Sequence, residues 1–253
     1  MLGAIIGDIV GSRFEYGGRN MPNFKLFTPE CTFTDDTICI AAIADAVING
    51  GDYAECLLKW CAKYPFPFGG YGSKFKEWLD NPSHKAYNSW GNGSAMRVSA
   101  IGWAFDSIQK TMKEAERSAK ITHSHPEGIK GAVCIATLIY QLRNKELIKE
   151  DIPDWLDVNF EYHLPDLSEV KGMNDSCMET VPQAIQCFME SDDFENTIRK
   201  AVAIGGDTDT TAAIAGAVAE ALYPIPKEIK EKAIKYLSAD IKALIAEFFA
   251  KFR

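Results

Sequence analysis

The stretch Gly205–Ala219 reads GGDTDTTAAIAGAVA and joins an acidic cluster to a run of small, apolar residues. A helix formed by that run would be apolar all round, and such a helix is buried. Asp207 and Asp209 stand two positions apart, which puts them on one side of an extended segment but about 200° apart on a helix. The leading glycine pair permits an unusual backbone in front of them. We therefore predict a buried helix with two carboxylates converging at its start, if it begins near Thr210.

A second cluster of similar composition, Thr34-Asp35-Asp36-Thr37, precedes the apolar segment ICIAAIA at residues 38–44. This segment also predicts a buried helix, so the carboxylates at its start should lie at the edge of a core. Helix capping alone could account for either cluster, since Asp and Thr are favoured at helix N-termini. A cap needs only one side chain, however, and the two clusters together hold four aspartates.

Four carboxylates gathered without basic partners repel one another, so a cation is expected to neutralise them. Neither cluster has a Lys or Arg beside it in the sequence. Oxygen ligands of this kind suit a hard cation, Mg²⁺ or Mn²⁺, better than Ca²⁺. Two clusters could hold two ions, which together can activate water and orient a substrate. The residues alone thus predict a divalent-metal site.

Helical periodicity dominates the 253 residues. The predicted helices cover residues 3–16, 35–49, 53–63, 94–106, 111–121, 127–143, 178–190, 193–203, 209–222 and 227–250, the last divided near Ser238. Loops are predicted at residues 17–18, 65–72, 81–82 and 90–93, and an irregular connection with a short helix at 144–176. No segment alternates apolar and polar residues for long enough to predict a strand. We expect an all-α fold in a single domain over residues 1–253.

Composition narrows the class of protein. The net charge of −8 and the pI near 5.1 argue against binding nucleic acid through a basic surface. The seven cysteines form no C-x-x-C pair, which favours reduced thiols. The first residues do not have the pattern of a signal peptide, and no stretch approaches the ~18 apolar residues of a membrane span. We expect a cytoplasmic monomer without a membrane or stable nucleic-acid partner.

The pairing of T-D-D-T at residues 34–37 with G-G-D-T-D-T-T-A at residues 205–212 resembles the ADP-ribosylglycohydrolase family. That family includes the dinitrogenase reductase-activating glycohydrolase and the ADP-ribosylhydrolases, and the similarity runs from about Gly3 to Pro226. The resemblance implies a compact, all-α orthogonal helical bundle with two Mg²⁺ or Mn²⁺ ions. The implied metal ligands are Thr34, Asp35, Asp36, Asp207, Asp209 and Thr210. The implied catalytic residues are Glu15, Asp35, Asp36 and Asp209.

The opening G-x-x-x-G-D-x-x-G-S-x-x-E, residues 3–15, is similar to the first helix of the family. Its three glycines form a smooth stripe that allows another helix to pack closely. Asp8, Ser12 and Glu15 fall on one polar face of the same helix. From the residues alone this face could simply be solvated. The resemblance instead implies that Glu15 lies at the catalytic centre, as a base, an acid or a ligand.

Three further segments resemble the ligand cleft of the family. The implied substrate-binding residues are Tyr71, Gly72, Ser89, Trp90, Gly91, Asn92, Gly93, Ser94 and His123. Small residues in the 89–94 loop would let backbone N–H groups approach a pyrophosphate, and Trp90 would stack on adenine. An ordinary packed Trp90 and a capping or packing role for His123 remain alternatives.

The resemblance implies a hydrolase that releases ADP-ribose by cutting an N- or O-glycosidic bond at C1″ of the distal ribose. Its partner would be an ADP-ribosylated protein or small molecule. Arginine, serine, O-acetyl and nucleobase linkages all remain open, as does the choice between Mg²⁺ and Mn²⁺. A non-catalytic ADP-ribose-binding module and a two-metal phosphoesterase are the alternatives. The product would separate them, because a phosphoesterase releases AMP or phosphate in place of intact ADP-ribose.

Overall fold

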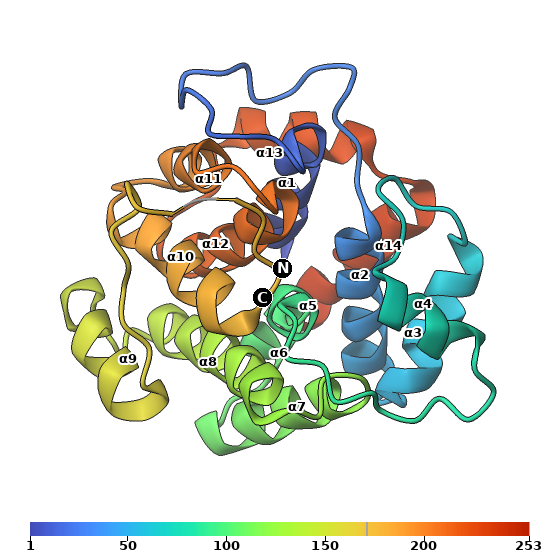
Figure 1. Cartoon of the computed structure of the whole chain (residues 1–253). Coiled ribbons are helices and arrows are strands. Elements are labelled where there is room, and N and C mark those ends of the chain that lie inside the picture. Colours follow the sequence, from blue (N-terminus) through green and yellow to red (C-terminus); the bar gives the residue numbers. More distant parts are fainter. Residues whose placement is uncertain (171, 253) are drawn as a thin grey trace.

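The computed structural model describes residues 1–170 and 172–252, and these residues form helices and loops without a strand. The prediction of an all-α fold is confirmed (Figure 1). The α-helices are α1 (Leu2–Gly11), α2 (Asp35–Asn49), α3 (Tyr53–Lys63), α4 (Ser73–Asp80), α5 (Gly93–Met96), α6 (Ser99–Ala104), α7 (Ile108–Lys120), α8 (Pro126–Arg143), α9 (Ile152–Phe160), α10 (Cys177–Met189), α11 (Phe194–Ala203), α12 (Thr208–Leu222), α13 (Lys227–Ala233) and α14 (Ala239–Phe252). Short 3₁₀ helices are η1 (Ser12–Phe14), η2 (Lys149–Asp151) and η3 (Ile234–Tyr236).

Helix α12 lies at the centre of the molecule, and all its residues from Thr208 to Glu220 are buried. Its alanines and glycine let neighbouring helices approach closely. The glycine stripe of α1 packs against it, as predicted: a Cβ atom on Gly7 would lie 2.0 Å from the carbonyl oxygen of Ala212. A Cβ on Gly11 would lie 2.5 Å from the Cα of Asp209. The small residues of two distant segments thus bring the end of α1 to the start of α12.

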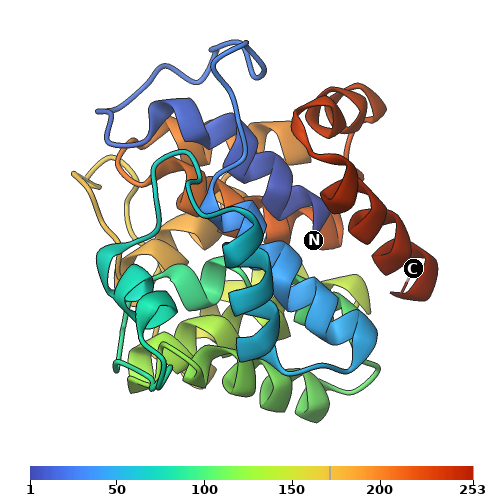
Figure 2. The ribbon, with the colours of Figure 1, turned by 90° about the vertical axis from the view of Figure 1, so that its right-hand side faces the viewer.

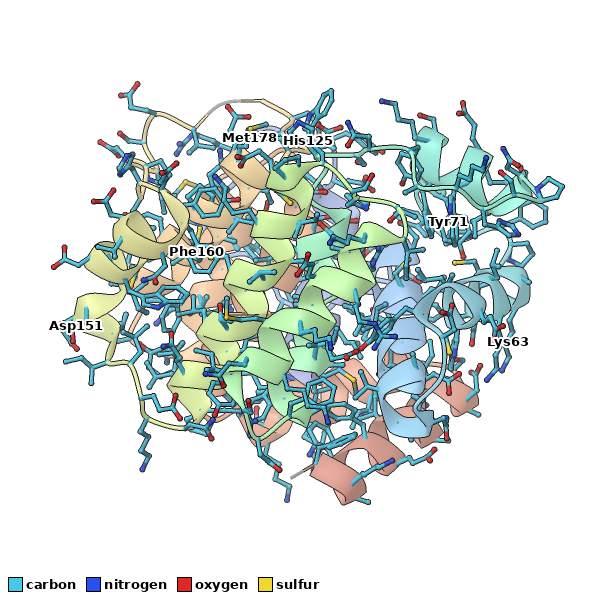
Figure 3. All side chains as sticks on the ribbon, turned by 90° about the horizontal axis from the view of Figure 1, so that it is seen from below. Lys63, Tyr71, His125, Asp151, Phe160 and Met178 are labelled. Carbon is cyan, nitrogen blue, oxygen red and sulfur yellow. The ribbon has the colours of Figure 1, made fainter. Side chains whose placement is uncertain are left out.

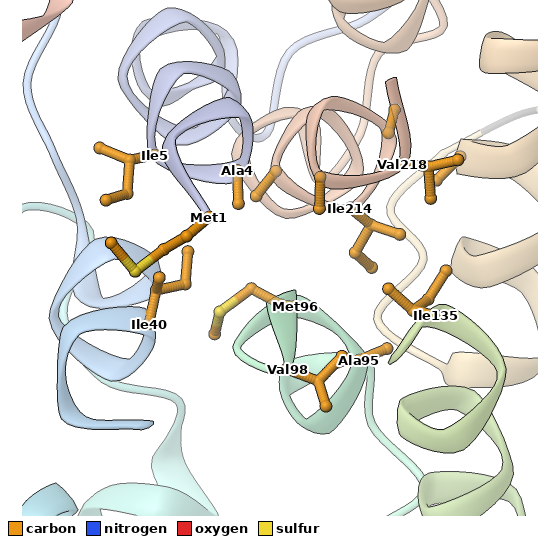
Figure 4. Packing of buried hydrophobic residues seen from close by; sticks show 14 of the residues in the cluster. Met1, Ala4, Ile5, Ile40, Ala95, Met96, Val98, Ile135, Ile214 and Val218 are labelled. Atoms are coloured by element: carbon orange, nitrogen blue, oxygen red, sulfur yellow. The ribbon is translucent and has the colours of Figure 1, made fainter. Parts of the chain in front are cut away.

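Helix α2 is the second buried helix, and it packs against α1, α3 and α6. Side chains from α1, α2, α5, α8 and α12 meet in one core, in which Ile5, Ile40, Met96, Ile135 and Ile214 are buried (Figure 4). The C-terminal helices α13 and α14 lie outside α1 and α2 (Figure 2). Helix α9, with Phe160, and helix α3, with Lys63, lie on opposite sides of the molecule (Figure 3).

The predicted helices at 35–49 and 53–63 have the observed bounds, and the last one divides before Ala239, close to Ser238. The predicted helix at 94–106 is wrong as one element, since it divides into α5 and α6 around Arg97 and Val98. The guanidinium of Arg97 is buried there and donates to the carbonyl of Ser118 and the hydroxyl of Thr122. Helix α4 was not predicted, because only Phe75 and Trp78 of its eight residues are buried.

The first predicted helix, 3–16, is also too long, because the α-helix ends at Gly11 and Glu15 already has an extended backbone. No helix among the described residues has the length and apolarity needed to cross a membrane.

Candidate metal and ligand-binding site

A cavity of about 450 Å³ lies where the ends of several elements meet. The end of η1, the start of α2 and the start of α12 supply its acidic side chains. The loops before α4 and α5 form other parts of its wall. Of the residues predicted for the site, it is lined by Glu15, Asp35, Asp36, Tyr71, Gly72, Ser89, Trp90, Gly91, Asn92, Gly93, His123, Asp207, Asp209 and Thr210.

Carboxylate oxygens of Glu15, Asp207 and Asp209 lie within 4.8 Å of one another. Helix α12 begins at Thr208, one residue before the predicted helix at 209–222 and two before Thr210, near which the start was expected if the two aspartates were to converge. The two aspartates still converge, because Asp207 is the N-cap residue, with the non-helical angles φ −78° and ψ 72°. The separation of about 200° expected for two helical residues therefore does not apply to this pair.

Backbone pairing holds Glu15 beside Asp207. The N–H of Tyr16 donates to the carbonyl of Gly206 (3.1 Å), and the N–H of Gly206 donates to the carbonyl of Gly17 (2.9 Å). Gly206 has a φ of +79° and Gly205 has a φ of +80°, in the left-handed region that glycine adopts without a Cβ clash. Gly205 and Gly206 thus allow the backbone hydrogen bonds between the segment after η1 and the segment before α12.

The first cluster enters the site from the start of α2. Thr34 is the N-cap residue, and its hydroxyl accepts a hydrogen bond from the N–H of Asp36 (3.1 Å). The carboxylates of Asp35 and Asp36 line the cavity, whereas Thr34 does not. Thr34 is 1% exposed, and its N–H and its hydroxyl both donate hydrogen bonds to the carboxylate of Asp8. A solvated polar face on α1 is therefore ruled out for Asp8, which is completely buried.

Burial raises the pKa of Asp35, Asp36 and Asp209, and neighbouring carboxylates raise it further. Burial likewise raises the pKa of Glu15 and of Asp207. Within residues 1–170 and 172–252, no Lys or Arg forms an ion pair with any of the five. Five carboxylates crowded in this way need a positive charge to remain ionised.

Two carboxylate oxygens in the cluster, Oδ2 of Asp36 and Oδ1 of Asp209, are buried without a hydrogen-bond partner. Buried polar atoms nearly always have a hydrogen-bond partner, so a buried oxygen without one indicates a missing partner. The donors are all oxygens, as a hard divalent cation requires. The residues therefore fit Mg²⁺ or Mn²⁺.

The side chain of Asn92, which the resemblance assigns to substrate binding, is hydrogen-bonded to other residues of the protein in this structure. Its Nδ2 donates to Oδ2 of Asp207 (2.7 Å) and to the hydroxyl of Thr180 (3.2 Å). Its backbone N–H donates to the carbonyl of Asp175 (2.7 Å), and the N–H of Gly91 donates to the hydroxyl of Ser89 (3.0 Å). These two N–H groups are therefore not free to approach a pyrophosphate, contrary to the expectation for the loop.

Ser94 does not line the cavity either. It is completely buried, and its hydroxyl donates to the carbonyl of Gly128 (2.7 Å). This bond fastens α5 to α8, because Gly128 lies in the first turn of α8. The assignment of Ser94 to substrate is therefore not matched by its position.

Trp90 is one of the aromatic residues that line the cavity, and it is 47% exposed. The rings of Trp90 and His125 form a T-shaped pair with centroids 5.7 Å apart, and Nζ of Lys74 lies 5.5 Å from the centroid of Trp90. His125 itself caps α8 by accepting from the N–H of Glu127, so it differs from its neighbour His123. Trp90 is therefore not a packed core residue, since about half of it is exposed at the wall of the cavity.

His123 lies at the cavity wall and is only 6% exposed. Its Nδ1 pairs with the hydroxyl of Thr122 (2.7 Å), which also accepts from Arg97. Burial, together with the charge of Arg97, lowers the pKa of His123 well below its usual value. The imidazole is thus neutral at physiological pH.

Tyr71 reaches the cavity from the loop before α4, and its hydroxyl donates to the carbonyl of Tyr64 (2.7 Å). Sequence reasoning missed Lys74, Arg97, Met173 and Asp175, which also line the cavity. Asp175 and Met173 come from the irregular connection after α9, where the sequence has no pattern that predicts a position. Only the folded chain brings that connection against the 89–94 loop.

The fold and the site define an all-helical protein with an acidic, oxygen-rich cavity suited to divalent cations. The family model for ADP-ribosylglycohydrolase matches residues 1–253, and the chain belongs to this family. It is 26% identical to the human ADP-ribosylhydrolase ARH3, across 96% of this chain and 90% of the relative. It is 31% identical to an uncharacterised protein of Archaeoglobus fulgidus, across 86% of this chain and 84% of that protein.

A solved structure described as an ADP-ribosylglycohydrolase-related protein complex has the same fold, with a TM-score of 0.74. It is 21% identical to this chain, and the match covers 100% of this chain and 96% of that one.

Proposed function

We propose that the protein is a hydrolase that releases ADP-ribose from an ADP-ribosylated target by a metal-dependent reaction. The convergence of Glu15 with Asp207 and Asp209, at a cavity that also exposes Trp90, carries this proposal. Membership of the ADP-ribosylglycohydrolase family and similarity to a protein named as an ADP-ribosylhydrolase support it. The bond to be cut would join C1″ of the distal ribose to a nitrogen or oxygen of the target.

Two divalent cations would be held by Asp35, Asp36, Asp207 and Asp209, with Thr34 and Thr210 as neutral oxygen ligands. When bound, such ions orient hydroxyl groups and lower the pKa of water. The buried oxygens of Asp36 and Asp209 that lack partners support this assignment. In the metal-free protein, repulsion among the carboxylates would favour their protonated forms.

Glu15 would act as the general base that accepts the proton of the attacking water. Glycoside cleavage develops positive charge at the anomeric carbon and needs a group that accepts the proton of the attacking water. Glu15 is half-buried at the cavity wall, and burial raises its pKa toward the range useful for a general base. Gly69 leaves room for it, since a Cβ atom there would lie 3.0 Å from Oε2 of Glu15.

The far end of the ligand would lie against Trp90, whose partly exposed indole suits stacking on a purine. His123, being neutral, would contact a ribose or phosphate oxygen by a hydrogen bond and not by charge. Asn92 would act indirectly, by holding Asp207 in place.

The test is release of free ADP-ribose from arginine-, serine- and O-acetyl-linked substrates, each with Mg²⁺, Mn²⁺ or EDTA. Release from at least one of them that EDTA abolishes would support the proposal and identify the linkage. AMP or phosphate as the product would indicate a phosphoesterase. Tight binding of ADP-ribose without turnover on any linkage would indicate a binding module.

A further inference from the structure

Asp8 is a completely buried carboxylate that accepts four hydrogen bonds from Thr34 and Thr37, at the start of α2. Its Oδ1 accepts from the hydroxyl of Thr34 (2.8 Å). Its Oδ2 accepts from the N–H of Thr34 (3.1 Å), the N–H of Thr37 (3.0 Å) and the hydroxyl of Thr37. Both oxygens are thus used within the protein, and neither is oriented as a ligand for an ion in the cavity.

Asp8 has no cationic partner within the described part of the chain. Burying a charge without a partner is costly, and its hydrogen bonds offset only part of that cost. Its bonds to Thr34 and Thr37 also place this carboxylate at the start of α2, next to the segment from which Asp35 and Asp36 line the cavity. In the metal-free protein Asp8 therefore adds repulsion to a cluster that is already crowded.

The hydrogen bonds to Asp8 and Asp36 orient the hydroxyl of Thr34. A hydroxyl has one proton and two lone pairs. The proton is donated to Asp8, and one lone pair accepts from the N–H of Asp36. No other hydrogen bond to this hydroxyl is found among the described residues, so its second lone pair would be open to a cation of the proposed site, with the proton held away from it. The same bonds fix the backbone from Thr34 to Thr37, and hence the entry of Asp35 and Asp36 into the cavity.

We propose that Asp8 is a positioning residue for the divalent cations: without touching them, it orients the oxygen of Thr34 and strengthens the negative potential of the site. This inference rests on the proposed metal-dependent function. It also accounts for a buried carboxylate that lacks a cationic partner, because the bound cations compensate a charge that is unfavourable without them.

The test is Asp8→Asn, which keeps the shape of the side chain and the acceptor for three of the four bonds. The new amide group would face Thr34 as a donor, so the hydroxyl of Thr34 would accept both from that amide and from the N–H of Asp36. The proton of the hydroxyl would then have to point along the direction left for the cation. We expect Mn²⁺ to bind at least about tenfold more weakly in calorimetric titration at pH 8, without substrate. In EDTA the melting temperature should equal or exceed that of the wild type, because a buried charge has been removed.

Asp45→Asn is the matched control. Asp45 is also a buried carboxylate, on α2, but it is bonded to Lys59 and to the indole of Trp60 (2.7 and 2.8 Å). Its replacement should lower the melting temperature in EDTA and leave Mn²⁺ affinity unchanged. The two variants thus separate a residue that serves the cation from one that serves the fold.

Failure of the wild type to bind Mn²⁺ would overturn both this inference and the proposed function. Unchanged Mn²⁺ affinity in Asp8→Asn, with normal binding by the wild type, would overturn the inference alone. A variant that is unfolded or markedly less stable in EDTA would make Asp8 a folding residue and would also overturn it.

Discussion

Nδ2 of Asn92 donates a hydrogen bond of 2.7 Å to Oδ2 of Asp207, and this bond joins the loop before α5 to the start of α12. The loop expected to bind substrate therefore also sets the orientation of an expected metal ligand. Thr180 of α10 accepts from the same amide group, so three segments meet at one side chain.

Replacing Asn92 with Asp should reduce ADP-ribose release more than replacing it with Ala. The aspartate adds a carboxylate next to Asp207, whereas alanine only removes the donor. We expect a loss of about tenfold for Asn92→Ala and a further loss for Asn92→Asp, measured as kcat/KM with saturating Mg²⁺. Equal activity of Asn92→Asp and the wild type would contradict the orienting role.

Asp207→Ala or Asp209→Ala should lower turnover at least about a hundredfold, or about 2.7 kcal/mol in the activation barrier. The fold should survive, because removing one of several repelling carboxylates relieves the metal-free site. Circular dichroism and Mn²⁺ titration would accompany the assay. Asp154→Ala, at an exposed acid on α9, is the control and should behave as the wild type. Near-normal turnover in the Asp207 or Asp209 variant would eliminate the metal assignment.

Gly7→Ala should destabilise the protein by about 3 kcal/mol or prevent folding, because its methyl group would meet the backbone of α12 at 2.0 Å. Gly18→Ala is the control, since a Cβ atom there meets nothing within 4 Å. Its stability should be unchanged or slightly increased. Chemical denaturation of both variants would measure the difference, and equal midpoints would show that α1 and α12 do not need this close approach.

Stability without metal should increase as the pH falls. The folded-state pKa values of Glu15, Asp35, Asp36, Asp207 and Asp209 are raised. Unfolded carboxyls titrate near pH 4, so these groups contribute stability that is complete below about pH 4 and is lost as the pH rises through the folded values. In EDTA the melting temperature should therefore be higher at pH 5.5 than at pH 8.

Mg²⁺ should reverse this trend, because a bound cation favours the ionised carboxylates. The rise in melting temperature on adding Mg²⁺ should be larger at pH 8 than at pH 5.5. A larger rise at the lower pH, or none at either, would argue against a cation bound by these carboxylates.

Trp90→Ala should weaken ADP-ribose binding about tenfold, since stacking of an aromatic side chain on a base contributes about 1–3 kcal/mol. Trp90→Phe should retain most of the affinity because it keeps an aromatic face. Neither change should shift the melting temperature much, given the exposure of the side chain. Calorimetric titration with ADP-ribose is the measurement, and equal affinities of the alanine variant and the wild type would rule out stacking.

Local patterns predicted most of the helices. The segments at residues 38–44 and 212–219 are apolar all round, and each lies in a buried helix. Helix α4 was missed because it is short and mostly exposed, and the break at Arg97 was missed because that side chain is held by bonds to the distant residues Ser118 and Thr122. Neither feature follows from the spacing of apolar residues.

The sequence by itself determined the all-helical class, the glycine stripe of α1 and the two acidic clusters, since helix periodicity and residue size act over a few neighbouring residues. Only the tertiary structure decided that Glu15 meets Asp207 and Asp209, that Asp8 supports Thr34, and that Ser94 faces away from the cavity. These relations depend on contacts between segments far apart in the chain. Packing of α1 on α12 brings Glu15 to the two aspartates, packing of α1 on α2 brings Asp8 to Thr34, and packing of α5 on α8 buries Ser94. The order of residues within one helix does not reveal these pairings.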